Sequence, residues 1–427
     1  MTKENLKKIV SEEIDRNAEK IIGYGEEILK NPELGYKEYK TSELCKRVMR
    51  ECGIPYKDNL AVTGVKGRMK GKASELTVCV MGELDAVVCH SNPDADKVTG
   101  ASHACGHNAQ MAAMLGTMIG LSSVRNELYG DVCFMATPAE EFVEMEYRSA
   151  LREDGKISFF GGKQELIRTG EFDDVDMAMM FHAEGSHPEI SAYIDGSSLG
   201  FVAKTVEFIG KAAHAGGAPH EGINALNAAM SALMCIHAQR ETFKDEDKVR
   251  VHPIITNGGE LVNVVPSNVT METYVRGASL EAIRDASNKV DRAIKGASYA
   301  IGAECKIENI KGYLPLYQDK KMSRAFEENA RLFIPEERIE HGVDMTGSSD
   351  VGDLSHLIPV IQPTLGGYYG SLHSKDFKIA DKVSAYIIPA KIMAFTVIDL
   401  LCDGARLAKE VKSGFKPKLT KEEYINN

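Results

Sequence analysis

Hydrophobic and polar positions follow two different patterns along this chain, and each pattern predicts its own set of secondary-structure elements. Between residues 5 and 52, apolar residues recur at helical spacing on both sides of a turn at residues 31–35, which predicts two helices. Three short apolar runs follow, at residues 76–81, 130–136 and 177–181, and each is typical of a buried strand. A helix-forming run at residues 109–122 separates the first two strands. The alternation predicts an α/β domain with a mixed sheet flanked by helices.

The pattern of hydrophobic and polar positions changes near residue 199. An amphipathic strand at 202–210, a helix at 223–238, strands near 250–256 and 268–276, a helix near 280–297 and a strand at 301–309 follow one another. This β-α-β-β-α-β order is that of a ferredoxin-like α+β module. The chain then returns to a strand at 359–361 and a closing helix at 390–401. We therefore expect a first domain made of residues 1–197 and 312–427, with an inserted domain over residues 198–311.

Length and composition agree with two ordinary globular domains. The chain has 427 residues, too many for one comfortable core, and 43% of them are hydrophobic. A net charge of −11 and the lack of a basic cluster argue against a nucleic-acid partner. No apolar run is expected to span a membrane, and no secretory leader is expected at the N-terminus. The Lys-rich tail from about residue 412 is expected to be mobile.

Cysteine usage indicates the compartment. Nine cysteines without paired spacing predict reduced thiols in a cytoplasmic protein. Most of them, such as Cys79, Cys133 and Cys235, lie in apolar runs and are expected to be small core residues. Cys105 differs, because it stands in the segment His-Ala-Cys-Gly-His-Asn at residues 103–108.

That segment places two imidazoles and a thiol within five positions. In an extended turn, Cys105 and His107 can point to the same side, with Gly106 allowing the bend between them. Cysteine thiolate and neutral imidazole are preferred ligands of zinc and similar divalent ions. The segment alone supplies only part of a metal site.

Further polar residues stand where the predicted strands end. Asp85, Glu140, Glu141 and His182 each follow a buried run, and sites in open α/β sheets form beyond the carboxyl ends of strands. Of two adjacent glutamates, one can bind a metal while the other faces the bound water as general base. A solvated Glu-Glu loop and a structural histidine are the alternative interpretations. His214, among small residues at 210–217, indicates either a close backbone approach or a flexible turn.

Together these segments resemble the M20 family of metallopeptidases and amidohydrolases, in its amidohydrolase branch. The matching motifs stand at residues 31–36, 82–86, 103–108, 138–141, 222–225, 263–266 and 347–353. Within the branch, their forms are most similar to p-aminobenzoyl-glutamate hydrolase-like and dipeptidase-like proteins. Asn108 and Gln110 depart from the commoner Asp and His of the branch, and Val87 stands where a Pro is frequent.

The resemblance implies a site residue by residue. It implies that two divalent metal ions, zinc or manganese, are held by Cys105, His107, Glu141, His182 and His373, with Cys105 bridging. It also implies that Glu140 is the general base and acid and that Asp85 orients a ligand from behind.

The inserted domain would act as a lid. By resemblance, His214 from the lid of a partner subunit helps to hold the developing oxyanion. The residues implied for binding the substrate carboxylate and lining its pocket are Asn263, Arg276, Gly347 and Ser348. A homodimer through the lid domain is implied in the same way.

These features predict a metal-dependent amidohydrolase that cleaves an N-acyl or aroyl amino acid or a small dipeptide. The alternative is a non-catalytic or regulatory metal-binding subunit that pairs with a homologous active chain. Glu140 argues against that alternative, because a structural metal site needs no general base. A redox role for Cys105 is weak, since no second cysteine stands near it in the sequence.

Overall fold

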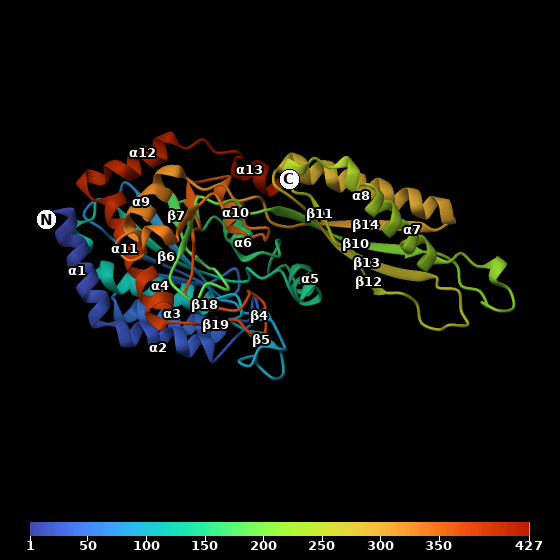
Figure 1. Cartoon of the computed structure of the whole chain (residues 1–427), viewed down its shortest axis with the longest axis horizontal. Helices are drawn as coiled ribbons and strands as arrows, with labels where there is room; N and C mark the ends of the chain where they lie inside the picture. Colours follow the sequence, from blue (N-terminus) through green and yellow to red (C-terminus); the bar gives the residue numbers. More distant parts are fainter. Residues whose placement is uncertain (427) are drawn as a thin grey trace. The chain divides into compact units, whose positions relative to one another are not determined.

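The computed structural model describes residues 1–426, which form two compact units. The first unit comprises Met1–Ser197, Tyr317–Asp344 and Asp353–Asn427, and the second comprises Ser198–Leu316 and Met345–Gly352. In Figure 1 the first unit contains elements from both ends of the colour scale, so it is built from both ends of the chain. Gly347 and Ser348 belong to the second unit, although their positions fall in the segment 312–427 that the sequence assigned to the first domain.

The main sheet of the first unit is mixed. In spatial order its strands are β1 (Tyr56–Leu60), β2 (Gly64–Met69), β6 (Asp131–Thr137), β3 (Thr77–Glu83), β7 (Met177–Met179) and β16 (Val360–Ile361). The last four are parallel, whereas β1 and β2 run antiparallel to their neighbours. Glu83 pairs with Thr137 in the register of β3 and β6. The carboxyl ends of the parallel strands therefore meet at one edge of the sheet, as the sequence predicted.

Helices pack around this sheet. They are α1 (Lys3–Arg16), α2 (Ala18–Leu29), α3 (Tyr39–Glu51), α4 (His107–Ser122), α5 (Met145–Glu153), α6 (Gly162–Thr169), α9 (Lys320–Ala330), α11 (Ile388–Leu401), α12 (Arg406–Gly414) and α13 (Lys421–Asn426). A short helix, α10 (Val351–Ser355), follows the segment 345–350. α4 and α11 pack against each other and against β3. Because α4 is buried nearly all round, its sequence is apolar on every side.

One helix of the first unit concerns the expectation about membrane-spanning segments. Val383–Leu401, a π-helical turn continued by α11, is long and apolar enough to cross a membrane, contrary to the reading of the sequence. Most of it is buried inside the first unit, where α1, α4 and α9 pack against α11.

Two further expectations about the chain ends are wrong. The region before the turn at 31–35 forms two helices rather than one, because Asn17 ends α1 by donating its side-chain amide to the Glu13 carbonyl and α2 begins at Ala18. The Lys-rich tail is docked rather than mobile. Tyr424 of α13 is fully buried and its hydroxyl donates to Asp353 over 2.8 Å.

Smaller sheets carry the loops at the carboxyl edge. A four-stranded sheet has the order β15 (Ile339–His341), β9 (Ala192–Ile194), β17 (Thr364–Leu365) and β8 (His182–Ala183). Two hairpin-like pairs are β4 (Val87–Val88) with β5 (Ala101–Ser102), and β18 (Tyr368–Tyr369) with β19 (Lys378–Ile379). His182 opens β8, and His373 lies in the loop between β18 and β19.

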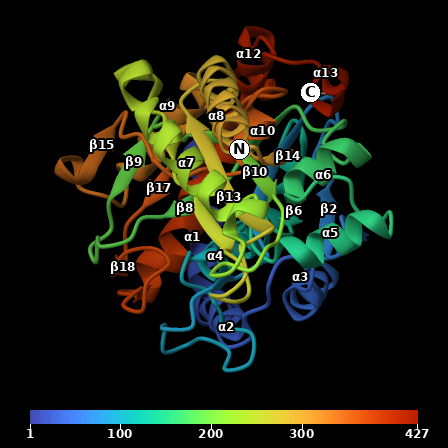
Figure 2. The same cartoon turned by 90° about the vertical axis from the view of Figure 1, so that its right-hand side faces the viewer.

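The second unit is an antiparallel sheet with two helices. Its strands are β10 (Gly200–Ile209), β11 (Arg250–Val251), β12 (Ile254–Asn257), β13 (Asn268–Gly277) and β14 (Glu304–Lys311), and its helices are α7 (Ala225–Ala238) and α8 (Leu280–Ile301). The order is β11-β13-β10-β14, with β12 also paired to β13. The helices lie side by side on one face (Figures 1 and 2) and enclose a core around Val206, Phe208 and Val290. Cys235 of α7 is exposed, so its predicted burial is wrong.

Candidate metal centre

A left-handed glycine directs the thiol and the first imidazole into one site. Gly106 has φ +81° and caps the N-terminus of α4, so the segment bends sharply instead of running extended. A Cβ on Gly106 would lie 2.5 Å from the Cβ of Ala183, which leaves room for no other residue. Cys105 therefore precedes the helix and His107 occupies its first turn. The N-terminus of a helix also favours a thiolate beside it.

The acidic pair stands on a strained turn after β6. Ala139 has φ +53°, a conformation that L-residues rarely adopt and that neighbours must hold in place. Its N–H donates to Glu38 over 2.8 Å, and the Arg148 guanidinium donates to the carbonyls of both Ala139 and Glu141. The turn carries the side chains of Glu140 and Glu141 to the carboxyl edge of the sheet.

The five ligands implied by the resemblance come together in two trios. In one trio the ligand atoms of Cys105, His107 and His182 lie within 4.8 Å of one another, and in the other those of Cys105, Glu141 and His373 do. The Cys105 sulfur belongs to both trios, as a bridging ligand would. His373 is 48% exposed, so one trio lies at the rim of the site.

The distances between these atoms suit a shared ion. Two nitrogen or oxygen ligands about 2.1 Å from one zinc ion lie about 3.0–3.4 Å apart, and a sulfur ligand lies about 3.6 Å from a nitrogen. His373 Nε2 is 3.0 Å from Glu141 Oε1, and Cys105 Sγ is 3.5 Å from His182 Nε2. Glu141 Oε1 is buried without a hydrogen-bond partner. A buried acceptor left without a hydrogen is expected where a cation binds.

Both buried imidazoles present a lone pair to the site. His107 Nδ1 is 2.9 Å from the Asp85 carbonyl, and His182 Nδ1 is 2.9 Å from the Ala183 carbonyl. Each Nδ1 must carry the hydrogen to make that bond, which leaves Nε2 as an acceptor or metal ligand. The Asp85 carboxylate lies 3.4 Å from His107 Nδ1 and accepts the Glu141 N–H over 2.9 Å. Asp85 thus supports two members of the site from behind.

The electrostatics of the cluster call for a cation. Burial alone raises the pKa of the Cys105 thiol, but the imidazoles of His182 and His107 lower it well below its ordinary value. Burial and the Cys105 thiolate together raise the pKa of Glu141 to about 7. Thiolate and carboxylates in a buried site need compensating positive charge. The donor set therefore fits a pair of divalent ions.

Sequence reasoning gave no role to Glu83, which makes a third group with His107 and Glu140. Glu83 Oε2 lies 3.0 Å from His107 Nε2, and Glu140 Oε2 lies 3.9 Å from the same nitrogen. The Lys163 ammonium of α6 donates to Glu83 Oε1 over 2.6 Å, and both side chains are fully buried. Glu83 stands two residues before Asp85 in the motif at residues 82–86, but nothing in the sequence indicated that it pairs with Lys163.

The remaining predicted residues lie in the second unit, in two separate places. Arg276, near the end of β13, donates to the Ser348 hydroxyl over 2.6 Å and stacks on Phe201. Leu199 donates to the Gly347 carbonyl close by. His214 and Asn263 lie at the other end of the sheet, beyond the pair Ile209 and Asn268, where Ala215 N–H donates to the Asn263 carbonyl. These residues do not form one cluster within the unit.

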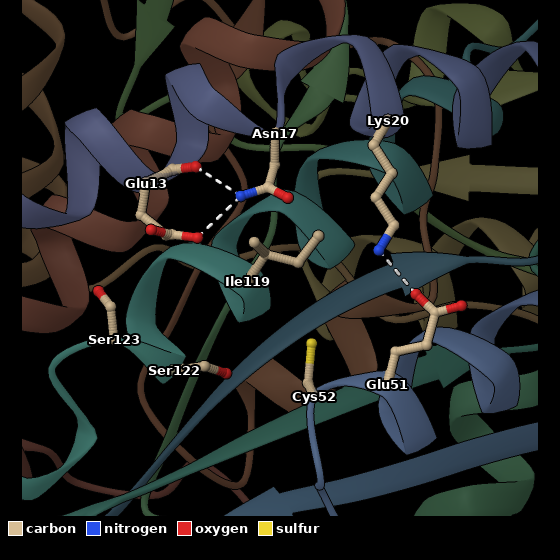
Figure 3. Close-up of a pocket in the computed structure, with 8 residues that line it drawn as sticks. All are labelled: Glu13, Asn17, Lys20, Glu51, Cys52, Ile119, Ser122 and Ser123. Atoms are coloured by element: carbon tan, nitrogen blue, oxygen red, sulfur yellow. Dashed lines mark hydrogen bonds and ion pairs between the residues drawn. The ribbon is translucent and has the colours of Figure 1, made fainter.

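A separate cavity in the first unit takes no part in this chemistry. It has a volume of about 340 Å³ and is lined by residues of α1, α2, α3 and α4, among them Lys20, Glu51 and Ile119 (Figure 3). It lies near the C-terminal end of α4, about 18 Å along the helix from His107 at the rise of an α-helix. Burial raises the pKa of the Cys52 thiol that lines it, so that thiol is not activated.

Comparison with known proteins identifies related sequences. Residues 79–398 match the peptidase family M20/M25/M40. The Xaa-Arg dipeptidase of Mus musculus is 30% identical, and the match covers 99% of this chain and 95% of that protein. The Xaa-Arg dipeptidase of Homo sapiens is 32% identical over 78% of this chain and 73% of that protein. An N-acyl-L-amino acid amidohydrolase of Geobacillus stearothermophilus is 25% identical over 74% of this chain and 81% of that protein.

Solved structures share the fold. A dinuclear metal-binding peptidase of the M20 family from Bacillus subtilis has a TM-score of 0.69 at 22% identity, covering 90% of this chain and 98% of that one. An aminobenzoyl-glutamate utilization protein from Klebsiella pneumoniae has a TM-score of 0.67 at 17% identity, covering 91% of this chain and 98% of that one. The likeness to p-aminobenzoyl-glutamate proteins is thus one of fold, whereas the sequence relatives include dipeptidases.

Proposed function

This chain belongs to peptidase family M20/M25/M40, a family of hydrolases, and we propose that it cleaves the amide bond of a dipeptide or an N-acyl amino acid by means of a metal-activated water. The convergence of two ligand trios on the Cys105 sulfur, with Glu140 beside them, is the observation that carries this proposal. A metal-binding structural subunit would need the ligands but not a second buried carboxylate next to them.

The residues divide the work as follows. Cys105, His107 and His182 would hold one zinc or manganese ion, and Cys105, Glu141 and His373 the other. Bound there, the ions would polarise the scissile carbonyl and lower the pKa of a water from 15.7 to about 7. Glu140 would take the proton of that water and return it to the leaving nitrogen. Asp85 would hold the His107 ring and the Glu141 backbone in position during the reaction.

A guanidinium in the second unit supports recognition of a substrate carboxylate. Arg276 is half-buried, stacks on Phe201 and Tyr274, and has no carboxylate partner among the described residues. A guanidinium keeps its charge and presents a planar fork that fits a carboxylate. The Ser348 hydroxyl, already bonded to Arg276, would orient this fork. Dipeptides and N-acyl amino acids both end in such a carboxylate.

The separation of His214 from Arg276 supports a homodimer. The eight residue steps from Asn268 to Arg276 along β13 span about 26 Å, and the His214 loop lies beyond Asn268. Within one chain, these two residues are therefore too far apart to contact the same small substrate. A second copy would supply the missing one, with contact through the exposed apolar side chains of α7, β12 and the loop after β12: Met230, Met234, Ile254, Leu261, Val262 and Val264.

Glu140→Gln tests the base assignment. In protein loaded with zinc or manganese, we expect the variant to retain metal and to lose hydrolysis across a panel of Xaa-Arg dipeptides and acyl-amino acids. Cys105→Ala should lower the metal content, since it removes the shared ligand. Equal turnover by parent and Glu140→Gln would refute the base. A metal-loaded parent that turns over no substrate would favour the regulatory-subunit alternative.

A mixing experiment tests the dimer. Glu140→Gln and His214→Ala should each be inactive alone, because each lacks one component of every site. Mixed after subunit exchange, they should regain about a quarter of parental activity, since half the dimers are mixed and each then has one intact site of two. No recovery, despite subunit exchange shown by mass, would contradict the shared site.

A further inference from the structure

Two charged side chains in the wall of the metal centre have no part in the proposed reaction. Glu83 and Lys163 are fully buried, and their ion pair measures 2.6 Å. A buried ion pair is costly to desolvate and is weak evidence for stability. Lys163 bonds to only one oxygen of the Glu83 carboxylate, Oε1. The other oxygen, Oε2, faces His107 of the metal centre.

The free oxygen of Glu83 points at a metal ligand rather than at a hydrogen. Glu83 Oε2 and His107 Nε2 lie 3.0 Å apart, yet both are buried atoms without a hydrogen-bond partner. The His107 ring has its hydrogen on Nδ1, which faces the Asp85 carbonyl. With a neutral imidazole both atoms are acceptors, and their approach at this distance is unfavourable unless a cation lies between them. The separation is that of two ligands on one ion at nearly right angles, about 3.0 Å.

The backbone and the ion pair fix Glu83 in this orientation. The Glu83 backbone N–H donates to the Gln110 side-chain oxygen over 3.3 Å, and Gln110 lies one turn into α4 from His107. Lys163, in the first turn of α6, donates to Oε1 of the Glu83 carboxylate. α4 therefore holds the backbone of Glu83 and α6 holds its carboxylate, with Oε2 directed at the site. A ligand held in advance in this way loses little freedom on binding.

We propose that Glu83 is a further protein ligand of the ion that His107 holds, and that Lys163 is the positioning residue that presents its carboxylate. This inference rests on the proposed function, because it presupposes that the ion binds there. It makes the two metal positions unequal: the buried ion gains a carboxylate ligand, whereas the ion of Glu141 and His373 lies at the rim.

Zinc binding by the full-length protein tests the proposal. Titration against a competing chelator gives the two affinities, and X-ray absorption at the zinc edge gives the average ligand set. Glu83→Gln keeps the shape and can still accept from Lys163, but it removes the anionic ligand. We expect it to weaken one zinc site by more than about 100-fold, beyond the 10–100-fold that a residue orienting a ligand supplies. The oxygen count around zinc should fall as well.

Companion variants separate a ligand from a structural ion pair. Lys163→Met leaves the carboxylate but no longer orients it, so it should retain both zinc ions with a 10–100-fold loss of affinity at one site. A purely structural pair would make Lys163→Met as harmful as Glu83→Gln. The double variant Glu83→Gln with Lys163→Met removes both charges of this ion pair, yet it should still lose the tighter zinc site. Asp131→Asn is the matched control, because it breaks a buried carboxylate's 2.9 Å contact with Lys70 at the far edge of the same sheet.

Each outcome decides between the ideas. Unchanged affinities and an unchanged zinc edge in the double variant, in a parent that binds two zinc ions and hydrolyses amides, would overturn the role of Glu83 and leave the proposed function standing. Equal losses in Lys163→Met and Glu83→Gln would also overturn it. A parent that binds no zinc and hydrolyses nothing would overturn both.

Discussion

The Glu38 carboxyl group is buried beneath the turn that carries the acidic pair, and its protonation should set part of the pH dependence of stability. Glu38 is fully buried. One oxygen accepts the Ala139 N–H over 2.8 Å and the other lies 2.5 Å from the Thr63 hydroxyl. Burial first, and then the charge of Asp85, raise the pKa of Glu38 from 4.5 to about 8. The folded protein therefore holds this group protonated at neutral pH, whereas the unfolded chain ionises it.

The sign and size of the effect follow from linkage. Because the folded-state pKa is the higher one, the stabilising contribution is complete below about pH 4.5 and is lost as the pH rises toward about 8. At about 1.4 kcal/mol per pH unit, the loss between pH 5 and 8.5 is about 4 kcal/mol. Glu38→Gln has the shape of the neutral acid and can still accept from Ala139 and donate to Thr63. Its stability should lack this part of the pH dependence.

Urea unfolding of metal-free protein, followed by circular dichroism, gives the comparison. The variant should gain about 4 kcal/mol relative to the parent between pH 5 and 8.5, with the two nearly equal at the acid end. Taking the difference between two proteins at each pH removes contributions from groups that both share. A difference that stays flat across this range, or that favours the parent at high pH, would refute a neutral buried Glu38.

Two further changes test how the acidic turn is held. Arg148→Met removes the buried guanidinium that donates to the carbonyls of Ala139, Phe160 and Glu141. It should lower the free energy of unfolding in urea by about 3–5 kcal/mol and should also lower kcat. Recovery by Arg148→Lys would contradict this, because one ammonium cannot replace the planar guanidinium. Gly162→Ala would put a Cβ 1.7 Å from the Pro138 carbonyl and should lower both thermal stability and zinc content, whereas an equal result for Gly23→Ala, where nothing lies within 4 Å, would show that the clash is not responsible.

The strand ends were predictable because parallel strands finish at a common edge. Asp85, Glu140 and His182 each follow a buried apolar run, and that pattern alone indicated that they meet. His373 lies in an irregular loop between two short strands, with nothing periodic around it. Only the resemblance indicated it.

The buried residues that support the site could not be predicted from the hydrophobic pattern. Glu38, Arg148 and Lys163 are ionisable and buried. Glu38 and Lys163 bond to partners far along the chain, and Arg148 donates to carbonyls 7 to 12 residues away. Periodicity assigns charged positions to the solvent side, so it hides the few that are turned inward. Asn108 shows the same limit. It departs from the commoner Asp of the branch, and the structure shows its amide donating to the Tyr386 hydroxyl, a helix-packing contact that the sequence did not indicate.

The discontinuity of the first unit orders the assembly of the metal centre during synthesis. Cys105, His107, His182 and Glu83 all lie within the first 182 residues, whereas His373 follows the whole inserted unit. A nascent chain emerges at about 5–20 residues per second, so the rim position lacks its histidine for about 10–40 seconds after the buried trio is complete. The strand β16, which closes the main sheet beside β7, emerges in the same late stretch. The proposed second metal position would therefore be completed only after β16 has been synthesised, and its occupancy would show that the chain has grown past His373.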